Sequence, residues 1–137
     1  MKSKRLLWCA ALAILATTGV ICIVWFWGNK PFNTLKSEEI VSAQVQVLPP
    51  DTKMQINDRD TIEELTDILR KAVIYRQDDS YKEYVGQAVR FTVEMRDGRK
   101  LEVVAYNPFL IINGIGYRTK YEPCEALNML GNRLIGK

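Results

Sequence analysis

The feature that most constrains this chain is a run of 22 positions without a charged side chain, residues 6–27, LLWCAALAILATTGVICIVWFW. As an α-helix rising 1.5 Å per residue, the run would span about 33 Å, close to the roughly 30 Å hydrocarbon core of a bilayer. Aromatic rings favour bilayer interfaces, and here Trp8 lies near one end of the run while WFW closes the other. The sequence therefore predicts one transmembrane helix that contacts membrane lipid through residues 6–27.

Basic residues on one side of this run set its expected orientation. Lys2, Lys4 and Arg5 precede it, and the cytoplasmic flanks of membrane helices carry an excess of Lys and Arg. We expect residues 1–5 to form a cytoplasmic tail and the chain after Trp27 to lie outside the cell. The expected localisation is the cell membrane, with a single pass, a cytoplasmic N-terminus and an extracellular C-terminal domain.

A cleaved signal peptide is the main alternative to this anchor. The apolar region of a signal peptide covers about 7 to 15 residues and is followed by small residues at the cleavage site. Here the run is longer and ends in WFW, and its small residues lie inside it. A lipoprotein needs a small residue directly before an acylated Cys, whereas Cys22 follows Val20 and Ile21. The pattern therefore favours an uncleaved anchor.

The rest of the chain carries no net charge. Of the 19 Lys and Arg residues, three lie within residues 1–5, so residues 28–137 hold 16 basic and 16 acidic side chains. We expect no nucleic-acid partner, because such binding depends on concentrated basic surface. The sequence also contains no His, which excludes His-based acid–base catalysis, His-activated nucleophiles and His-ligated zinc.

Motifs of the common catalytic and cofactor classes do not occur in the sequence. It lacks GxxxxGK[ST], GxGxxG followed by a helix, CxxC, HExxH and EF-hand spacing. Adjacent acids at 38–39, 63–64 and 78–79 belong to no recognisable motif, and solvated surface is the ordinary explanation for them. For Cys124 we expect burial, with a thiol activated at a helix start as the alternative. We predict no enzyme activity and no cofactor.

After a spacer at residues 28–36, hydrophobic periodicity predicts an α+β domain over residues 37–137. Apolar side chains spaced three and four apart predict one helix that begins at Asp60 and one with Pro123 at its first position, weakened by Gly131. Strands are predicted at residues 40–48, 53–57, 87–95, 101–105 and 115–119, mainly from alternating apolar and polar side chains. The continuous apolar run at residues 109–112, bounded by turn signals, predicts a sixth strand. In the first strand the expected inward-facing residues are Val41, Ala43, Val45 and Val47.

Turn chemistry and chain order give the expected architecture. Asp97-Gly98 and Asn113-Gly114 favour two-residue hairpin turns, so the last four strands are expected to form a meander and the first two a hairpin. Asp60 with Glu63, or Thr61 with Glu64, is expected to cap the first helix. We predict an antiparallel sheet with two helices packed on one face, preceded by the transmembrane helix.

The least regular part of the domain, residues 75–86, is called here the tyrosine segment and is expected to be a loop with about one helical turn. Tyrosine and arginine are enriched at protein interfaces, because they bury a large area and still form hydrogen bonds. Two alternatives stay open: one or two tyrosines fold back as a lid on the sheet, or Asp78, Asp79 and Glu83 hold calcium. The candidate binding residues are Tyr75, Arg76, Asp78, Asp79, Tyr81 and Tyr84.

Three stretches of the outer domain carry a family resemblance: LKSEEI before the first strand, INDRDTIEELTDIL at the helix entry, and FTVEMRDGRKLEVVAYNPFLIINGIGYRT in the meander. Over roughly residues 35–135 the chain resembles the small membrane-anchored or lipoprotein domains of unknown function of Gram-positive bacteria. Many such domains are lipid-anchored, whereas this chain lacks a usable lipobox. The resemblance implies a Gram-positive cell-envelope setting and no assigned chemistry.

Together these features predict a membrane-anchored binding or regulatory module on the outer face of the membrane, with an unknown protein partner. One alternative is a sensing domain for a small ligand or ion, with a pocket lined by inner sheet residues and the tyrosine segment. Another is an anchored immunity or inhibitor protein that shields its own cell.

Overall fold

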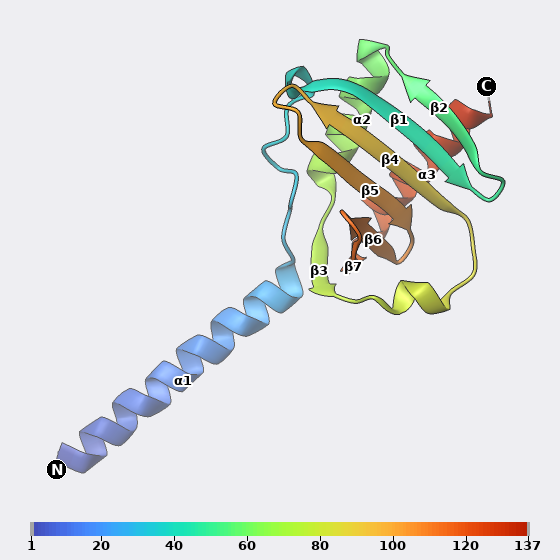
Figure 1. Ribbon diagram of the computed structural model, residues 1–137. Helices are drawn as coiled ribbons and strands as arrows, with labels where there is room; N and C mark the ends of the chain where they lie inside the picture. Colours follow the sequence, from blue (N-terminus) through green and yellow to red (C-terminus); the bar gives the residue numbers. More distant parts are fainter. Residues whose placement is uncertain (1, 137) are drawn as a thin grey trace.

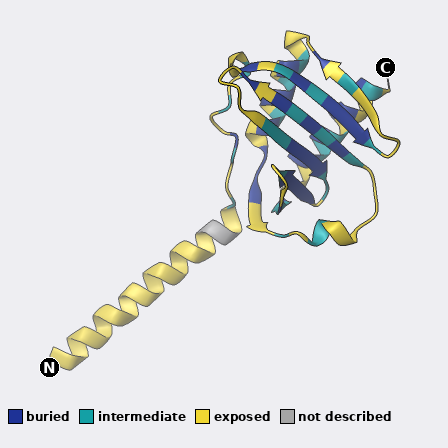
Figure 2. Ribbon diagram, in the orientation of Figure 1, coloured by how far each residue is buried: buried dark blue, intermediate teal, exposed yellow. Residues whose placement is uncertain are grey.

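A computed structural model describes residues 2–136, apart from the side chains of residues 24 and 25. Its first element is the helix α1 (Lys2–Trp27), which extends away from the domain (Figure 1) and exposes its described side chains along its whole length (Figure 2). The apolar helix expected over residues 6–27 is confirmed, and it begins four residues earlier. It is long and apolar enough to cross a membrane. An apolar surface on all sides of a helix is favourable in lipid and costly in water.

The remaining chain forms a seven-stranded antiparallel sheet in the order β2-β1-β4-β5-β6-β7-β3. Helices α2 (Arg59–Lys71) and α3 (Tyr121–Ile135) lie together on one side of this sheet (Figure 1), so the expected class, α+β with an antiparallel sheet, is confirmed. Two short 3₁₀ turns are η1 (Ser37–Glu39) and η2 (Ser80–Glu83). The strands are β1 (Ile40–Leu48), β2 (Thr52–Ile56), β3 (Ile74–Gln77), β4 (Ala88–Met95), β5 (Lys100–Tyr106), β6 (Phe109–Ile112) and β7 (Ile115–Thr119).

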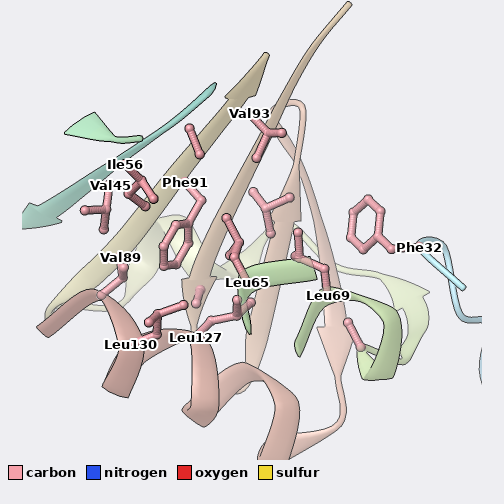
Figure 3. Packing of buried hydrophobic residues seen from close by; sticks show 14 of the residues in the cluster. Phe32, Val45, Ile56, Leu65, Leu69, Val89, Phe91, Val93, Leu127 and Leu130 are labelled. Carbon is pink, nitrogen blue, oxygen red and sulfur yellow. The ribbon is translucent and has the colours of Figure 1, made fainter. Parts of the chain in front are cut away.

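The main core lies between the sheet and these two helices. Alternate side chains of β1, β4 and β5 are buried against the apolar stripes of α2 and α3. Figure 3 shows Phe91 of β4 pointing toward Leu127 and Leu130 of α3, with Leu65 of α2 close by. Full burial of one such side chain contributes roughly 1.5 to 3 kcal/mol.

Helix α3 packs closely against β4 at Gly131. A Cβ atom at this position would overlap Cγ1 of Val89, a fully buried side chain. Glycine in a helix interior costs about 1 kcal/mol relative to alanine. Gly131 therefore weakens the helix locally, as its type predicts, but it also permits a close helix–sheet contact that a larger residue would prevent.

Two expectations about the first residues of β1 and α2 are wrong. Val41 is 58% exposed instead of buried, because the pairing of β1 with β4 shifts register between Ile40 and Ser42, and Ile40 takes the inward position. The N-cap of α2 is Asp58, whose carboxylate accepts the Thr61 amide at 2.9 Å, so the helix begins one residue earlier than expected.

The two Gly-containing turns differ from each other. Asn113 and Gly114 both have positive φ (48° and 85°), as the two-residue turn expected there requires. At the other turn Gly98 has φ of 87°, and its amide donates to the Met95 carbonyl at 3.0 Å. Strand β4 ends at Met95 and β5 begins at Lys100, so this connection is longer than the two-residue turn expected from the sequence.

Strand β3, which the sequence pattern does not predict, closes the edge of the sheet next to α1. It pairs with β7, placing Ile74 opposite Thr119. On its other side Asn29 exchanges two backbone hydrogen bonds with Ile74, at 2.7 and 2.8 Å. Phe32 is buried in the main core. Residues 28–36, expected as a spacer, therefore pack on the domain and connect α1 directly to the sheet edge.

Candidate functional site

The tyrosine segment covers part of the sheet face that the helices leave open. Successive strand side chains point to opposite faces, and Val103 and Leu110 belong to the main core. Their neighbours Val104, Phe109 and Ile111 therefore point the other way, where they form a second small apolar cluster. Partly buried side chains of Tyr81, Ala88 and Tyr106 pack against it.

Both Tyr81 and Tyr84 place their rings on Phe109. The centroid distances are 6.2 Å for Tyr81 and 5.5 Å for Tyr84, with tilted ring planes, which is the favourable range for aromatic pairs. A Cβ at Gly116 would lie 2.6 Å from Cδ1 of Tyr81, so the Tyr81 ring lies directly on the β7 backbone. Turn η2 thus brings both rings to one side of the segment, and that side faces the sheet.

Asp78 and Asp79 fasten the segment to β7. The Asp78 amide donates to the Gly116 carbonyl at 2.8 Å, and the Gly116 amide donates to Oδ1 of Asp79 at 3.1 Å. Arg118 Nε donates to Oδ2 of Asp78 at 2.8 Å. Hydrogen bonds from Ser80, followed by the bond from Arg118, hold the pKa of the Asp78 carboxyl well below its usual range. The aspartates thereby fix the path of the segment across the sheet.

Tyr75 and Arg76 lie apart from this group, on β3. Tyr75 is 39% exposed and sits beside Gly28, at the junction with α1. The Arg76 guanidinium is 3.9 Å from the Asp78 carboxylate, a long and exposed ion pair of small energetic weight. Of the six candidate residues, the structure brings together Asp78, Asp79, Tyr81 and Tyr84.

The tip of the segment projects into solvent. Tyr84 is 57% exposed although its ring contacts Phe109, and Val85 is fully exposed, at 103% of its reference area. Immediately after this tip, Gly86 approaches the Tyr106 ring, where an added Cβ would lie 3.1 Å from Cε2. The chain is therefore held on both sides of an exposed apolar tip.

Sequence reasoning missed Phe109, Arg118 and Val85 as parts of this site. One signal was present, because β6 reads FLII without alternation, and a continuous apolar run indicates a strand that is covered on both faces. Arg118 occupies the outward-facing position opposite Phe109 in the β6–β7 pairing. No local pattern marks Val85.

A hollow of about 290 Å³ lies beside the tip, between the tyrosine segment, the β5–β6 connection and α3. In the part of the chain that the structure describes, two buried side-chain oxygens at this hollow have no hydrogen-bond partner: Oδ1 of Asn107 and Oδ1 of Asn128. A buried acceptor left without a partner costs roughly 1 to 3 kcal/mol. The hollow therefore favours an occupant that donates hydrogen bonds.

Cys124 and the acidic residues complete the chemical inventory. Cys124 is buried, as expected, and burial raises the pKa of its thiol to about 12, so it is protonated at neutral pH. Its Sγ donates to the Phe109 carbonyl at 3.4 Å. Across residues 2–136, no three His, Cys, Asp or Glu side chains gather closely enough to hold a metal ion, and this includes Asp78, Asp79 and Glu83.

No protein-family model, curated protein or solved structure matches this chain.

Proposed function

We propose that this protein is a single-pass membrane-anchored binding or regulatory module without catalytic chemistry, and that it contacts a protein partner through Tyr84 and Val85. Helix α1 is its uncleaved anchor. Lys2, Lys4 and Arg5 at the start of α1 support a cytoplasmic N-terminus and a domain on the outer face. The resemblance to small membrane-anchored domains of Gram-positive bacteria supports a cell-envelope setting.

One observation carries the proposed contact: an exposed apolar tip on a segment that is otherwise fastened to the sheet. Val85 is fully exposed and Tyr84 more than half exposed, while Asp78, Asp79 and Tyr81 hold the preceding residues on β7 and Phe109. A loop that is already ordered loses little conformational entropy on binding. Tyrosine is also among the residues that most often anchor interfaces. The tip therefore has the chemistry and the rigidity of a contact point.

The hollow beside the tip supports a second candidate function, the sensing of a small ligand. Its volume of about 290 Å³ is near the lower end of the range for small-molecule sites. The aromatic walls from Tyr84, Tyr106 and Phe109 and the unpaired oxygens of Asn107 and Asn128 suit a flat molecule that donates hydrogen bonds. Such a ligand would lie under the tip and order it further.

Site-specific photo-cross-linking in the native cell tests the protein contact. A benzophenone amino acid replaces Val85 in one strain and Val41 in a control strain, because Val41 is also an exposed valine but lies at the start of β1. We expect a discrete protein adduct from position 85, absent from position 41 and lost when Tyr84→Ala is added. A small-ligand sensor would give no protein adduct at either position. Equal adducts at both positions would mean that the tip is not the contact.

A further inference from the structure

Four basic side chains gather where α1 enters the domain: Lys30, Arg70, Lys71 and Lys120. Two adjacent hollows share Lys30 and Lys71 in their walls, Lys120 lines the first hollow, and Arg70 lines the second. The acidic residues among the lining side chains are Asp67 and Glu122. These four residues, called here the juxtamembrane basic cluster, make a patch of net positive charge on a domain that has no net charge as a whole.

The charges of the juxtamembrane basic cluster are not neutralised within the protein. Over residues 2–136, none of its four members forms an ion pair with a carboxylate. The ion pairs of the described chain use other residues, namely Arg76, Arg90, Arg99, Arg118 and Arg133. The cluster is therefore available to an external anion.

Backbone hydrogen bonds fix the juxtamembrane basic cluster beside the end of α1. Asn29, which precedes Lys30, pairs with Ile74, and the Lys120 amide donates to the Val73 carbonyl at 2.9 Å. Lys30 follows Trp27 by three residues, a span of at most about 10 Å. This distance is about one Debye length at 0.1 M salt, so Lys30 lies within the range over which a charged surface at the end of α1 still acts on it.

The neighbouring residues of β3 have the composition of a membrane interface. Tyr75 is partly exposed and contacts the chain at Gly28, the first residue after α1. Arg76, next to it, leaves 57% of its side chain exposed. Tyrosine rings favour the headgroup region, and long basic side chains lay their apolar stems along a surface while the charged ends reach the phosphates. Apolar, aromatic and basic groups thus meet at one edge of the sheet.

We infer that the juxtamembrane basic cluster binds the anionic phospholipid headgroups of the leaflet from which α1 emerges, and so holds the β3 edge of the domain against the membrane. Basic residues beside a membrane helix are attracted to anionic leaflets in this way. The opposite edge of the sheet, β2, then points away from the bilayer. The inference rests on the proposal that α1 is a membrane anchor.

Amine footprinting of the full chain in vesicles tests this docking. The protein is reconstituted in phosphatidylcholine alone or with about one third anionic phosphatidylglycerol. A membrane-impermeant acetylating reagent then modifies exposed lysines, and mass spectrometry compares Lys30, Lys71 and Lys120 with Lys53 on β2. In anionic vesicles we expect labelling of the three cluster lysines to fall at least about threefold relative to Lys53. Labelling should recover in about 1 M salt, where the Debye length is about 3 Å.

A pair of matched variants identifies the charges responsible. Lys71→Gln with Lys120→Gln should restore the labelling of Lys30 relative to Lys53 in anionic vesicles. Arg99→Gln with Lys100→Gln removes two exposed basic residues outside the cluster and should leave Lys30 protected. Equal labelling of the cluster lysines in both lipid compositions overturns the docking. A chain that fails to float with vesicles overturns the anchor as well. A chain that floats with unprotected lysines overturns the docking alone.

Discussion

The guanidinium of Arg118 lies over the ring of Phe109, with Cζ 4.5 Å from the ring centroid, while its Nε–H donates to Asp78 at 2.8 Å. One side chain of β7 therefore joins the second apolar cluster to the tyrosine segment. Removing its acidic partner should loosen the segment without disturbing the main core, which lies on the other face of the sheet.

The Asp78→Asn variant, which removes the carboxylate that pairs with Arg118, should change how the stability of the domain depends on pH in acid. The pKa of Asp78 is lower in the folded state than the value of about 3.9 for an unfolded chain, so the unfolded state binds more protons as the pH drops. The stabilisation from Asp78 is therefore fully present above about pH 4 and decreases as pH falls below that value. Thermal unfolding between pH 7 and pH 2 measures this effect. The melting temperature of wild type should exceed that of the variant at neutral pH, and the two melting temperatures should converge in acid.

The exposed residue Asp67, which forms no ion pair in the described chain, supplies the control for this experiment. The Asp67→Asn variant should change the free energy of unfolding at neutral pH by no more than about 0.5 kcal/mol. A difference in melting temperature between wild type and Asp78→Asn that stays constant down to acid pH would contradict the role assigned to the Asp78 carboxylate.

Tyr81 and Tyr84 should differ in their contribution to folding. Tyr81→Ala removes a ring that lies on Gly116 and Phe109, and we expect a loss of about 2 kcal/mol in the free energy of unfolding. Tyr84→Ala removes a ring that is mostly solvent-exposed, so the loss should stay below about 1 kcal/mol. Denaturant titration of the full chain in detergent measures both values. Equal losses would mean that Tyr84 is part of the lid and is not free for a partner.

Gly131→Ala should destabilise the domain although alanine favours helices. The added methyl would overlap Cγ1 of the buried, β-branched Val89, and overpacking of this kind costs typically about 1 to 3 kcal/mol. Adding Val89→Ala should recover part of the loss, so that the two changes together cost less than their sum. Strictly additive effects in denaturant titrations would show that the helix and β4 do not meet at this point.

The register of β4 is tested by two neighbouring residues. Phe91 is fully buried in the main core, and Phe91→Ala should cost about 3 to 5 kcal/mol. Thr92 points to the open face, and Thr92→Ala should change stability by no more than about 0.5 kcal/mol. Similar losses for the two variants would place the strand one residue out of register.

Local patterns predicted the elements whose residues alternate or recur on one face. The strands that pair through Asn113-Gly114 have the expected bounds, and the apolar stripe of α2 is buried as its spacing requires. Strand β3 could not be predicted in this way, because Ile74 is its one buried residue and its partners, β7 and Asn29, are distant in sequence. Its existence depends on tertiary pairing.

The candidate site was predicted by composition, but its orientation depends on contacts with other elements. Three tyrosines in an irregular stretch predicted a binding segment or a lid. Whether a given tyrosine covers the sheet or is free for a partner depends on Phe109 and Gly116. These two residues belong to later strands, and the rings that contact them turn one face of the segment inward. The role of Gly131 also depends on tertiary contacts. Its residue type predicts a weak helix, whereas its close packing against Val89 explains why glycine is suitable there.

The central claim, that α1 anchors an outward-facing domain, is tested most directly by cysteine labelling of intact cells. Cys124 is buried, whereas Cys9 and Cys22 are exposed on α1 and are first replaced by alanine, so that a new cysteine at an exposed position is the one labelled. Lys53→Cys on β2 and Ser3→Cys in the first turn of α1, ahead of the uncharged run 6–27, form the matched pair. The account predicts that an impermeant maleimide labels full-length Lys53→Cys in the membrane fraction of intact cells, and labels Ser3→Cys only after the membrane is opened. Labelling in the reverse order, or a Lys53→Cys domain released from the membrane by cleavage, would contradict it.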